Sequence, residues 1–376
     1  MPKKPWWWYR KQKQQAAKAA ARQPKGILSP TVAQIFARHP IHDNIFIRLS
    51  AASLARMSSV CRDVRVVTID FMVRAYNLNR RLSHFFRDPP AFRALQSRTL
   101  LVISGSFVLQ FLDRTFYPES DLDLYVRTHD SFREVGLWLQ DEGYAYKPSS
   151  EEEARTFLEE VEDLDGETWQ DYGSNRMTAV YNFERKPLNS ASNDTRKVQV
   201  ILPPLDALDE YESPMKVIMG FHSTCVMNFI NHEAAYSLYP YATFEKRCAL
   251  VFIDNDGSKR ALAKYAARGF KMLNRDVNFR KCRSGIYKDP FSSPGFLIDG
   301  ERKVADRFTW VLPLVPSHPE SPARSSTGRW SGDLQRHWKV CEKRQGLDCQ
   351  TRFAVYKCFL WSQGDCYPLP PAVSRL

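Results

Sequence analysis

Two carboxylates, Asp121 and Asp123, stand two residues apart in the stretch Asp-Leu-Asp-Leu-Tyr-Val, which alternates polar and apolar side chains. This alternation predicts a half-exposed β-strand, on which residues i and i+2 point to the same face. Two like charges so close repel each other unless a cation lies between them. A divalent ion is the simplest such cation, because Mg²⁺ binds one or two carboxylates together with phosphate oxygens. The pair therefore predicts a metal site.

An apolar run at residues 99–104 ends in Gly105-Ser106, about fifteen residues before the carboxylates. The run predicts a short buried strand, and residues 107–112 predict a helix directly after it. Glycine lets a backbone approach a phosphate closely, while Ser106 and the helix N-terminus offer hydrogen-bond donors. This arrangement predicts that Gly105 and Ser106 bind nucleotide phosphates.

The order of Gly-Ser turn, helix and Asp-x-Asp strand resembles the nucleotidyltransferase fold family over about residues 99–202. The resemblance implies that Gly105 and Ser106 hold a triphosphate. It also implies that Asp121 and Asp123 are the catalytic carboxylates and ligate Mg²⁺.

The third carboxylate that this family often supplies from a later strand is missing from its expected place. The strand expected at residues 196–202 carries Gln199 at its inward position, and an amide is not a base and binds Mg²⁺ weakly. Nothing in the spacing argues for Glu184 as a substitute. The site is therefore interpreted as degenerate and used for binding. The alternative is an active Mg²⁺-dependent nucleotidyltransferase that acts on ATP or a related triphosphate.

A second pattern lies at residues 45–65, where apolar residues recur every three or four positions and predict short packed helices. From Leu49 through Val60-Cys61-Arg62 it resembles the F-box, the adaptor-binding module of cullin–RING ubiquitin ligases. It departs from that module at His39-Pro40-Ile41, where Leu-Pro is usual, and at Val64, where an aromatic is expected. The resemblance implies that five residues bind a Skp-type adaptor: Ile45, Phe46, Leu49, Leu54 and Val60. A helical cap on the next domain is the alternative.

Length and composition suit a globular protein of about two domains, with 376 residues of which 43% are hydrophobic and 26% charged. The net charge of +12 comes largely from residues 1–30, which hold eight Lys and Arg and no acidic residue. That arm can contact nucleic acid, act as a nuclear address or an organellar presequence, or simply be a solvated tail. Beyond it, we expect no nucleic-acid binding.

The location expected from the sequence is the cytoplasm or the nucleus. No apolar run approaches the roughly 20 residues of a membrane span, so no membrane partner is expected. Without a secretory signal, the eight cysteines are expected to be reduced.

The predicted organisation has four parts: a basic arm (1–30), an F-box-like helical segment (31–98), a nucleotidyltransferase-like mixed-sheet domain of α+β or α/β class (99–274), and a C-terminal extension (275–376). The extension is expected to contain a strand near 304–314 and a flexible loop at 316–332. In the domain, helix 258–270 is basic and either lines the triphosphate side or is an ordinary outer helix. The order of the parts resembles a group of uncharacterised fungal proteins, which brings an architecture and no substrate.

Overall fold

The structure is a computed structural model, and it describes residues 34–148, 155–166, 179–186, 195–203, 214–253, 255–274, 301–306, 308–315, 337–339 and 353–354. The chain divides into two compact units, Met1–Ala75 and Tyr76–Leu376. The predicted arm at 1–30 and the predicted loop at 316–332 lie outside the described residues. No helix in the described stretches is long and apolar enough to cross a membrane.

The described part of the first unit includes the helices α3 (His39–Phe46), α4 (Ala51–Met57) and α5 (Arg62–Ala75). Ser50 caps α4 by accepting a hydrogen bond from the backbone N–H of Ser53 at 3.2 Å. One face of each helix meets in a small core, in which the rings of Phe46 and Phe71 lie 5.5 Å apart and Leu54 is fully buried.

The second unit is built on an eight-stranded sheet of order β11-β7-β6-β1-β2-β5-β4-β3. Its strands are β1 (Val102–Ser104), β2 (Leu122–Tyr125), β3 (Ala145–Lys147), β4 (Ala179–Arg185), β5 (Arg196–Leu202), β6 (Asn228–Ile230), β7 (Ala234–Ser237) and β11 (Trp310–Pro313). Only β2 and β5 are parallel neighbours in this sheet. The mixed sheet confirms the expected α+β class.

Two smaller sheets accompany the large one. A parallel pair joins β8 (Cys248–Val251) to β9 (Lys271–Asn274), and a three-stranded sheet joins β10 (Glu301–Lys303), β12 (His337–Lys339) and β13 (Phe353–Ala354). A 3₁₀ turn, η1 (Thr224–Val226), and a π turn, η2 (Tyr241–Glu245), contact β8.

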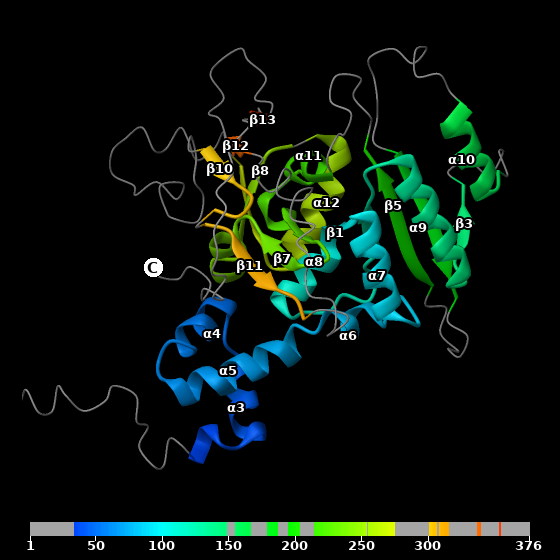
Figure 1. The fold of residues 1–376 in the computed structure, drawn as a ribbon. Coiled ribbons are helices and arrows are strands. Elements are labelled where there is room, and N and C mark those ends of the chain that lie inside the picture. Colours follow the sequence, from blue (N-terminus) through cyan, green and yellow to red (C-terminus); the bar gives the residue numbers. More distant parts are fainter. Residues whose placement is uncertain are drawn as a thin grey trace, which may run out of the picture. The chain divides into compact units, whose positions relative to one another are not determined.

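The helices of the second unit are α6 (Leu78–Leu82), α7 (Pro89–Thr99), α8 (Gly105–Asp113), α9 (His129–Asp141), α10 (Phe157–Gly166), α11 (Pro214–Met219) and α12 (Asp256–Ala267). In Figure 1, α7 and α9 lie beside β5, and α9 packs on both α7 and β5. Helix α8 packs on β1, β2 and β6 at the centre of the sheet. Every residue from Gly105 to Leu112 is buried, and the polar side chains among them, Ser106 and Gln110, are hydrogen-bonded to Ser120.

One predicted boundary differs from the division into compact units, and one predicted strand is present. Helices α6 and α7, which we placed in the helical segment 31–98, belong to the same compact unit as the sheet. The strand predicted near 304–314 is β11, which pairs antiparallel with β7 and so extends the large sheet. Phe92 of α7 stacks at 4.4 Å on Phe86, which lies in the segment between α6 and α7, and both rings are fully buried within the second unit.

Candidate functional site

The centre of the sheet brings the predicted phosphate-binding turn and the predicted carboxylates together. Strands β1 and β2 are antiparallel with Ser104 opposite Asp123, so the turn that follows β1 lies beside the carboxylates on β2. They line a cavity of about 230 Å³. Its walls are Gly105, Ser106, Asp121, Asp123, Tyr125, Gln199, Phe221, His222, Val226, Lys264 and Tyr265.

Gly105 is required at its position for two reasons. Its φ is +71°, in the left-handed region that side chains avoid. A Cβ built on Gly105 would lie 3.0 Å from Cγ of Asp123 and closer still to Oδ2, well inside van der Waals contact. The Asp123 carboxylate therefore packs directly against the Gly105 backbone, in the place that the Cβ of any other residue would take.

Ser106 lies at the cavity, but its hydroxyl is already used. Its Oγ lies 2.6 Å from Oγ of Ser120, which also accepts a hydrogen bond from Nε2 of Gln110 at 2.6 Å. Ser106 and Ser120 are both buried. The donors that remain for a phosphate are the backbone N–H groups of the first turn of α8, which have no partner within a helix.

Gln199 lies where the sequence places the missing carboxylate. In the parallel register of β2 and β5 it stands opposite Asp123, and its side chain lines the cavity. Its Nε2 donates to Oδ1 of Asn182 at 2.9 Å. Glu184 does not line the cavity and lies 3.4 Å from Nζ of Lys197. Among the described lining residues, the carboxylates are therefore Asp121 and Asp123.

Burial and mutual repulsion disfavour charge on the two aspartates. Both side chains are half-buried. Loss of hydration raises the pKa of Asp123 to about 7, with the neighbouring Asp121 adding to the rise and Lys264 opposing it. Burial also raises the pKa of Asp121, against the opposing fields of Lys197 and Lys264. A cation in the cavity would remove this cost.

Three residues from later in the chain also line the cavity. Lys264, on the basic helix that we expected either at the triphosphate side or as an ordinary outer helix, lines the cavity from α12. His222 lines it too, held at 2.9 Å from Oγ of Ser223, and burial lowers its pKa. Tyr265, the next residue on α12, also lines the cavity, and nothing in the sequence pattern predicted this.

The residues present fit a divalent ion. Asp121 and Asp123 provide oxygen ligands at one cavity, and Gly105 lets the Asp123 carboxylate pack against the turn that begins α8. Mg²⁺ commonly takes only one or two carboxylates and completes its shell with water and phosphate oxygens. Asp121 and Asp123 would hold the ion, and Lys264 is placed at the cavity to meet an anionic ligand.

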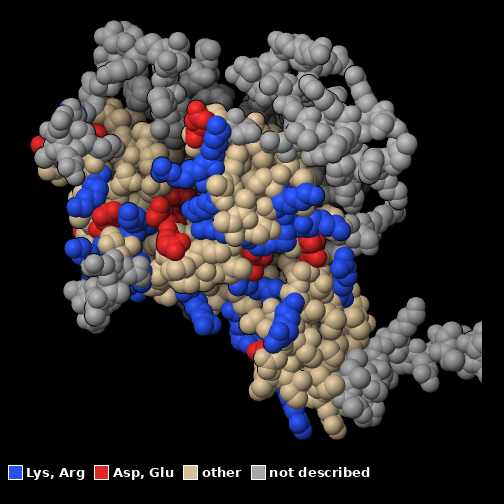
Figure 2. Space-filling model, turned by 180° about the vertical axis from the view of Figure 1, so that it is seen from behind, with Lys and Arg blue, Asp and Glu red and all other residues tan. Residues whose placement is uncertain are grey.

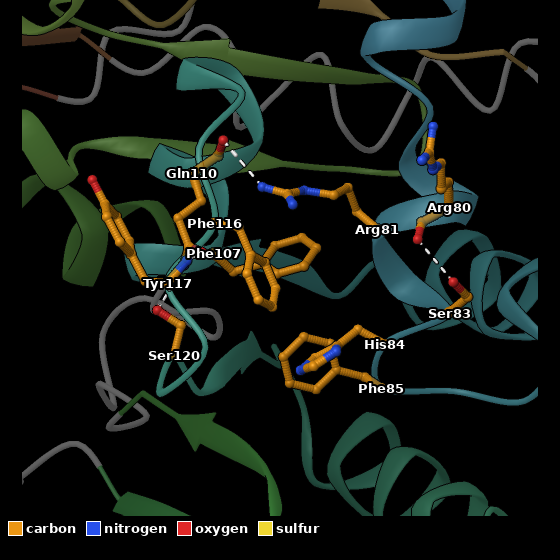
Figure 3. Close-up of a pocket in the computed structure, with 10 residues that line it drawn as sticks. All are labelled: Arg80, Arg81, Ser83, His84, Phe85, Phe107, Gln110, Phe116, Tyr117 and Ser120. Carbon is orange, nitrogen blue, oxygen red and sulfur yellow. Dashed lines mark hydrogen bonds between the residues drawn. The ribbon is translucent and has the colours of Figure 1, made fainter. Parts of the chain in front are cut away.

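A second cavity of about 320 Å³ lies on the other side of the Ser106–Ser120 hydrogen bond. Figure 3 shows Arg81 of α6 reaching across it toward Gln110, whereas the Arg80 side chain points away from Phe116. The Arg81 guanidinium lies 5.6 Å from the centre of the Phe116 ring. Arg81 donates to the carbonyl oxygens of Thr115 and Gln110, and burial lowers its pKa. Among the described residues, no carboxylate forms an ion pair with Arg80 or Arg81. The second cavity is thus cationic and aromatic.

The residues predicted to bind an adaptor do not share one exposed surface. Phe46 and Leu54 are fully buried in the core of the first unit, so we correct their assignment: they hold the unit together. Leu49 packs against that core. Ile45 and Val60 are exposed. Apolar residues that recur every three or four positions identify one face of a helix, but they do not show whether that face packs in the unit's own core or binds a partner.

An apolar stripe that the sequence analysis missed runs along α5. Val66, Ile69 and Val73 are 67%, 50% and 48% exposed. Their spacing of three and four residues puts them on one face, opposite the buried Val64 and Phe71. The signal was present in the sequence as a second set of apolar positions out of phase with the first.

The surface charge of the described residues is mixed. In Figure 2, Lys and Arg are spread over the face shown, and Asp and Glu lie among them. This face shows no continuous basic patch of the kind that nucleic-acid binding requires.

Comparison with known proteins adds no assignment. The chain matches no protein-family model, no curated protein and no solved structure.

Proposed function

We propose that the second unit binds a nucleoside triphosphate together with Mg²⁺, and that it serves mainly for binding rather than for rapid nucleotide transfer. The observation that carries the proposal is the shared cavity of Asp121, Asp123 and the Gly105 turn. A strand pair that sets two carboxylates beside a helix N-terminus is suited to an ion and its attached phosphates.

Electrostatics favour an ion–phosphate pair over either ligand alone. The cavity holds two carboxylates whose pKa values are raised and one lysine. A divalent ion offsets the carboxylates but leaves excess positive charge together with Lys264. A triphosphate brings the negative charge that balances the ion and the lysine. Each ligand should therefore strengthen the binding of the other.

Gln199 argues for binding over transfer. A nucleotidyltransferase needs a group that accepts the proton of the attacking hydroxyl, and an amide cannot do so. The position opposite Asp123 on β5 carries this amide, and it is already bonded to Asn182. The alternative, an active Mg²⁺-dependent nucleotidyltransferase, requires Asp121 or Asp123 alone to activate the hydroxyl.

The experiment is calorimetric titration of the full chain with ATP, GTP and CTP, each with and without Mg²⁺. Wild type should bind at least one triphosphate only when Mg²⁺ is present, and Asp123→Asn should lose that binding. Asp141→Asn, an exposed position on α9, is the matched control and should bind normally. Metal-independent binding, or equal binding by Asp123→Asn, contradicts the proposal.

Pyrophosphate release separates binding from transfer. The Gln199→Glu substitution keeps the side-chain length and adds a carboxylate at the third position. Slow release by wild type and faster release by this variant support a binding site that has lost a catalytic group. Rapid release by wild type, abolished in Asp123→Asn, instead supports the active transferase.

A second candidate function concerns the first unit, for which we propose adaptor binding to a Skp-type subunit of a cullin–RING ubiquitin ligase. The observation that favours it is the exposed stripe of Val66, Ile69 and Val73. An amphipathic helix with apolar residues at this spacing suits docking into a hydrophobic groove. These residues replace Phe46 and Leu54 as the proposed contacts.

Binding of the purified full chain to a purified Skp-type adaptor tests this second function. Ile69→Asp should weaken the complex at least roughly tenfold, because it puts a charge into an apolar contact. Arg56→Asp puts the same charge on the exposed face of α4 and should leave the affinity unchanged. The absence of a complex with wild type, or equal loss in both variants, contradicts adaptor binding through α5.

A further inference from the structure

We propose that the first unit binds a divalent transition-metal ion, with Zn²⁺ the best match, between His39, His42 and Asp43. One ligand atom from each of the three residues lies within 4.8 Å of the others, and among the described residues this is the one group of three that comes so close. All three belong to α3, at spacings of three and four residues that put them on one face.

His42 supplies the strongest argument. Its side chain is 1% exposed, and Nδ1 lies 3.0 Å from the carbonyl oxygen of Phe36. Because a carbonyl only accepts, Nδ1 carries a proton and Nε2 is the ring nitrogen that can face a ligand. This buried Nε2 makes no hydrogen bond. It lies 3.3 Å from Oδ1 of Asp43, so an ion placed between the two atoms would contact both, as a proton on Nε2 would.

The distances suit a tetrahedral ion. Zinc lies about 2.0–2.2 Å from imidazole nitrogen and carboxylate oxygen, which sets its ligands about 3.4 Å apart. His42 and Asp43 already have that separation. The ligand atoms of the group lie within 4.8 Å of one another, so that of His39 has to approach by up to about 1.4 Å, and its side chain is 66% exposed.

Neighbouring side chains orient the three ligands. Arg74 donates to both carboxylate oxygens of Asp43, at 2.6 and 2.9 Å, and so fixes the orientation of that carboxylate. Asp70 pairs with the same arginine, and its Oδ2 lies 3.8 Å from Nδ1 of His39. Such outer partners commonly fix metal-binding histidines and carboxylates. Two carboxylates against one guanidinium also leave a negative charge for the ion to offset.

The ligand set identifies the class of ion. Two imidazoles and one carboxylate favour Zn²⁺ and its neighbours over Mg²⁺, which prefers oxygen. Three protein ligands leave a fourth position for water, reached from the exposed side of His39. The site is separate from the Asp121–Asp123 pair and does not depend on the function proposed for it.

The test is titration of the full chain with Zn²⁺ against a chromophoric competitor under reducing conditions, because cysteines elsewhere can also bind zinc. His39→Ala removes an exposed ligand with little risk to folding, and His84→Ala, in the second unit, is the matched control. Wild type and His84→Ala should bind one more equivalent of zinc than His39→Ala. Since loss of an outer partner alone commonly weakens metal binding 10–100-fold, loss of a direct ligand should cost at least roughly 100-fold.

Asp70→Asn gives a second readout, because it keeps every direct ligand and should weaken zinc binding roughly tenfold. Thermal unfolding with added Zn²⁺ should raise the Tm of wild type more than that of His39→Ala. Equal stoichiometry and affinity in wild type and His39→Ala would overturn the proposal, whatever the other variants do.

Discussion

The Gly105→Ala substitution is expected to abolish divalent-ion binding while leaving the second unit folded. At φ +71° an alanine costs about 1–2 kcal/mol in free energy of unfolding. The new methyl group would overlap Oδ2 and Cγ of Asp123. Since the carboxylate is the free end of a side chain, it can rotate away at small further cost. The main effect is that Asp123 leaves the position it needs for the ion.

Gly269→Ala separates backbone strain from the collision. Gly269 has φ +86°, and a Cβ built there meets nothing within 4 Å. In both variants the free energy of unfolding should therefore fall by about 1–2 kcal/mol. Only Gly105→Ala should also lose affinity for the ion.

The assays are urea denaturation for stability and calorimetric titration with Mn²⁺, a stand-in for Mg²⁺, at pH 8. Wild type and Gly269→Ala should bind Mn²⁺ alike, and Gly105→Ala should bind it at least roughly tenfold more weakly, a loss of about 1.4 kcal/mol. If Gly105→Ala matches Gly269→Ala in both stability and Mn²⁺ affinity, the reasoning from the close approach is wrong.

Three further outcomes follow from the second unit. Because the pKa of Asp123 rises from 3.8 to about 7 on folding, the folded protein holds a proton that the unfolded chain releases. In metal-free buffer the free energy of unfolding should fall between pH 4 and pH 7, by on the order of 4 kcal/mol from this group. Asp123→Asn should remove that part of the slope in urea denaturation at stepped pH. Burial raises the pKa of Cys225 to about 11, so at pH 8 iodoacetamide should modify the half-exposed Cys248 and spare Cys225 until the protein is unfolded, as read by peptide mass spectrometry. Phe92→Ala should cost about 3–5 kcal/mol in thermal or urea unfolding, because it empties a fully buried ring stacked on Phe86.

The half of the site that lies within twenty residues could be predicted from the sequence. Gly105, Ser106, Asp121 and Asp123 come from one strand–helix–strand stretch, so strand periodicity and turn chemistry are enough to bring them together. Gln199 was found because a buried strand with alternating side chains shows which residue faces inward. All of these inferences use local rules, in which neighbours along the chain remain neighbours in space.

The rest depends on long-range packing, which periodicity does not encode. Lys264 lies near the carboxylates only because α12 packs on that side of the second unit. The sequence of residues 258–270 does not show on which side the helix packs. The same limit explains Phe46 and Leu54. Their spacing identifies a common helix face, but only the arrangement of three helices shows that this face is the unit's own core.

The position of β1 and β2 in the sheet has a consequence for synthesis on the ribosome. These strands can pair as soon as both have emerged, yet β5 follows β2 by about 75 residues and β6 follows β1 by more than 100. At about 5–20 residues per second, the outer edge of β2 stays unpaired for roughly 4–15 seconds, and that of β1 for longer. The pair of β1 and the carboxylate-bearing β2 thus presents two open strand edges during synthesis, and a chaperone that shields strand edges should act on this chain during that interval.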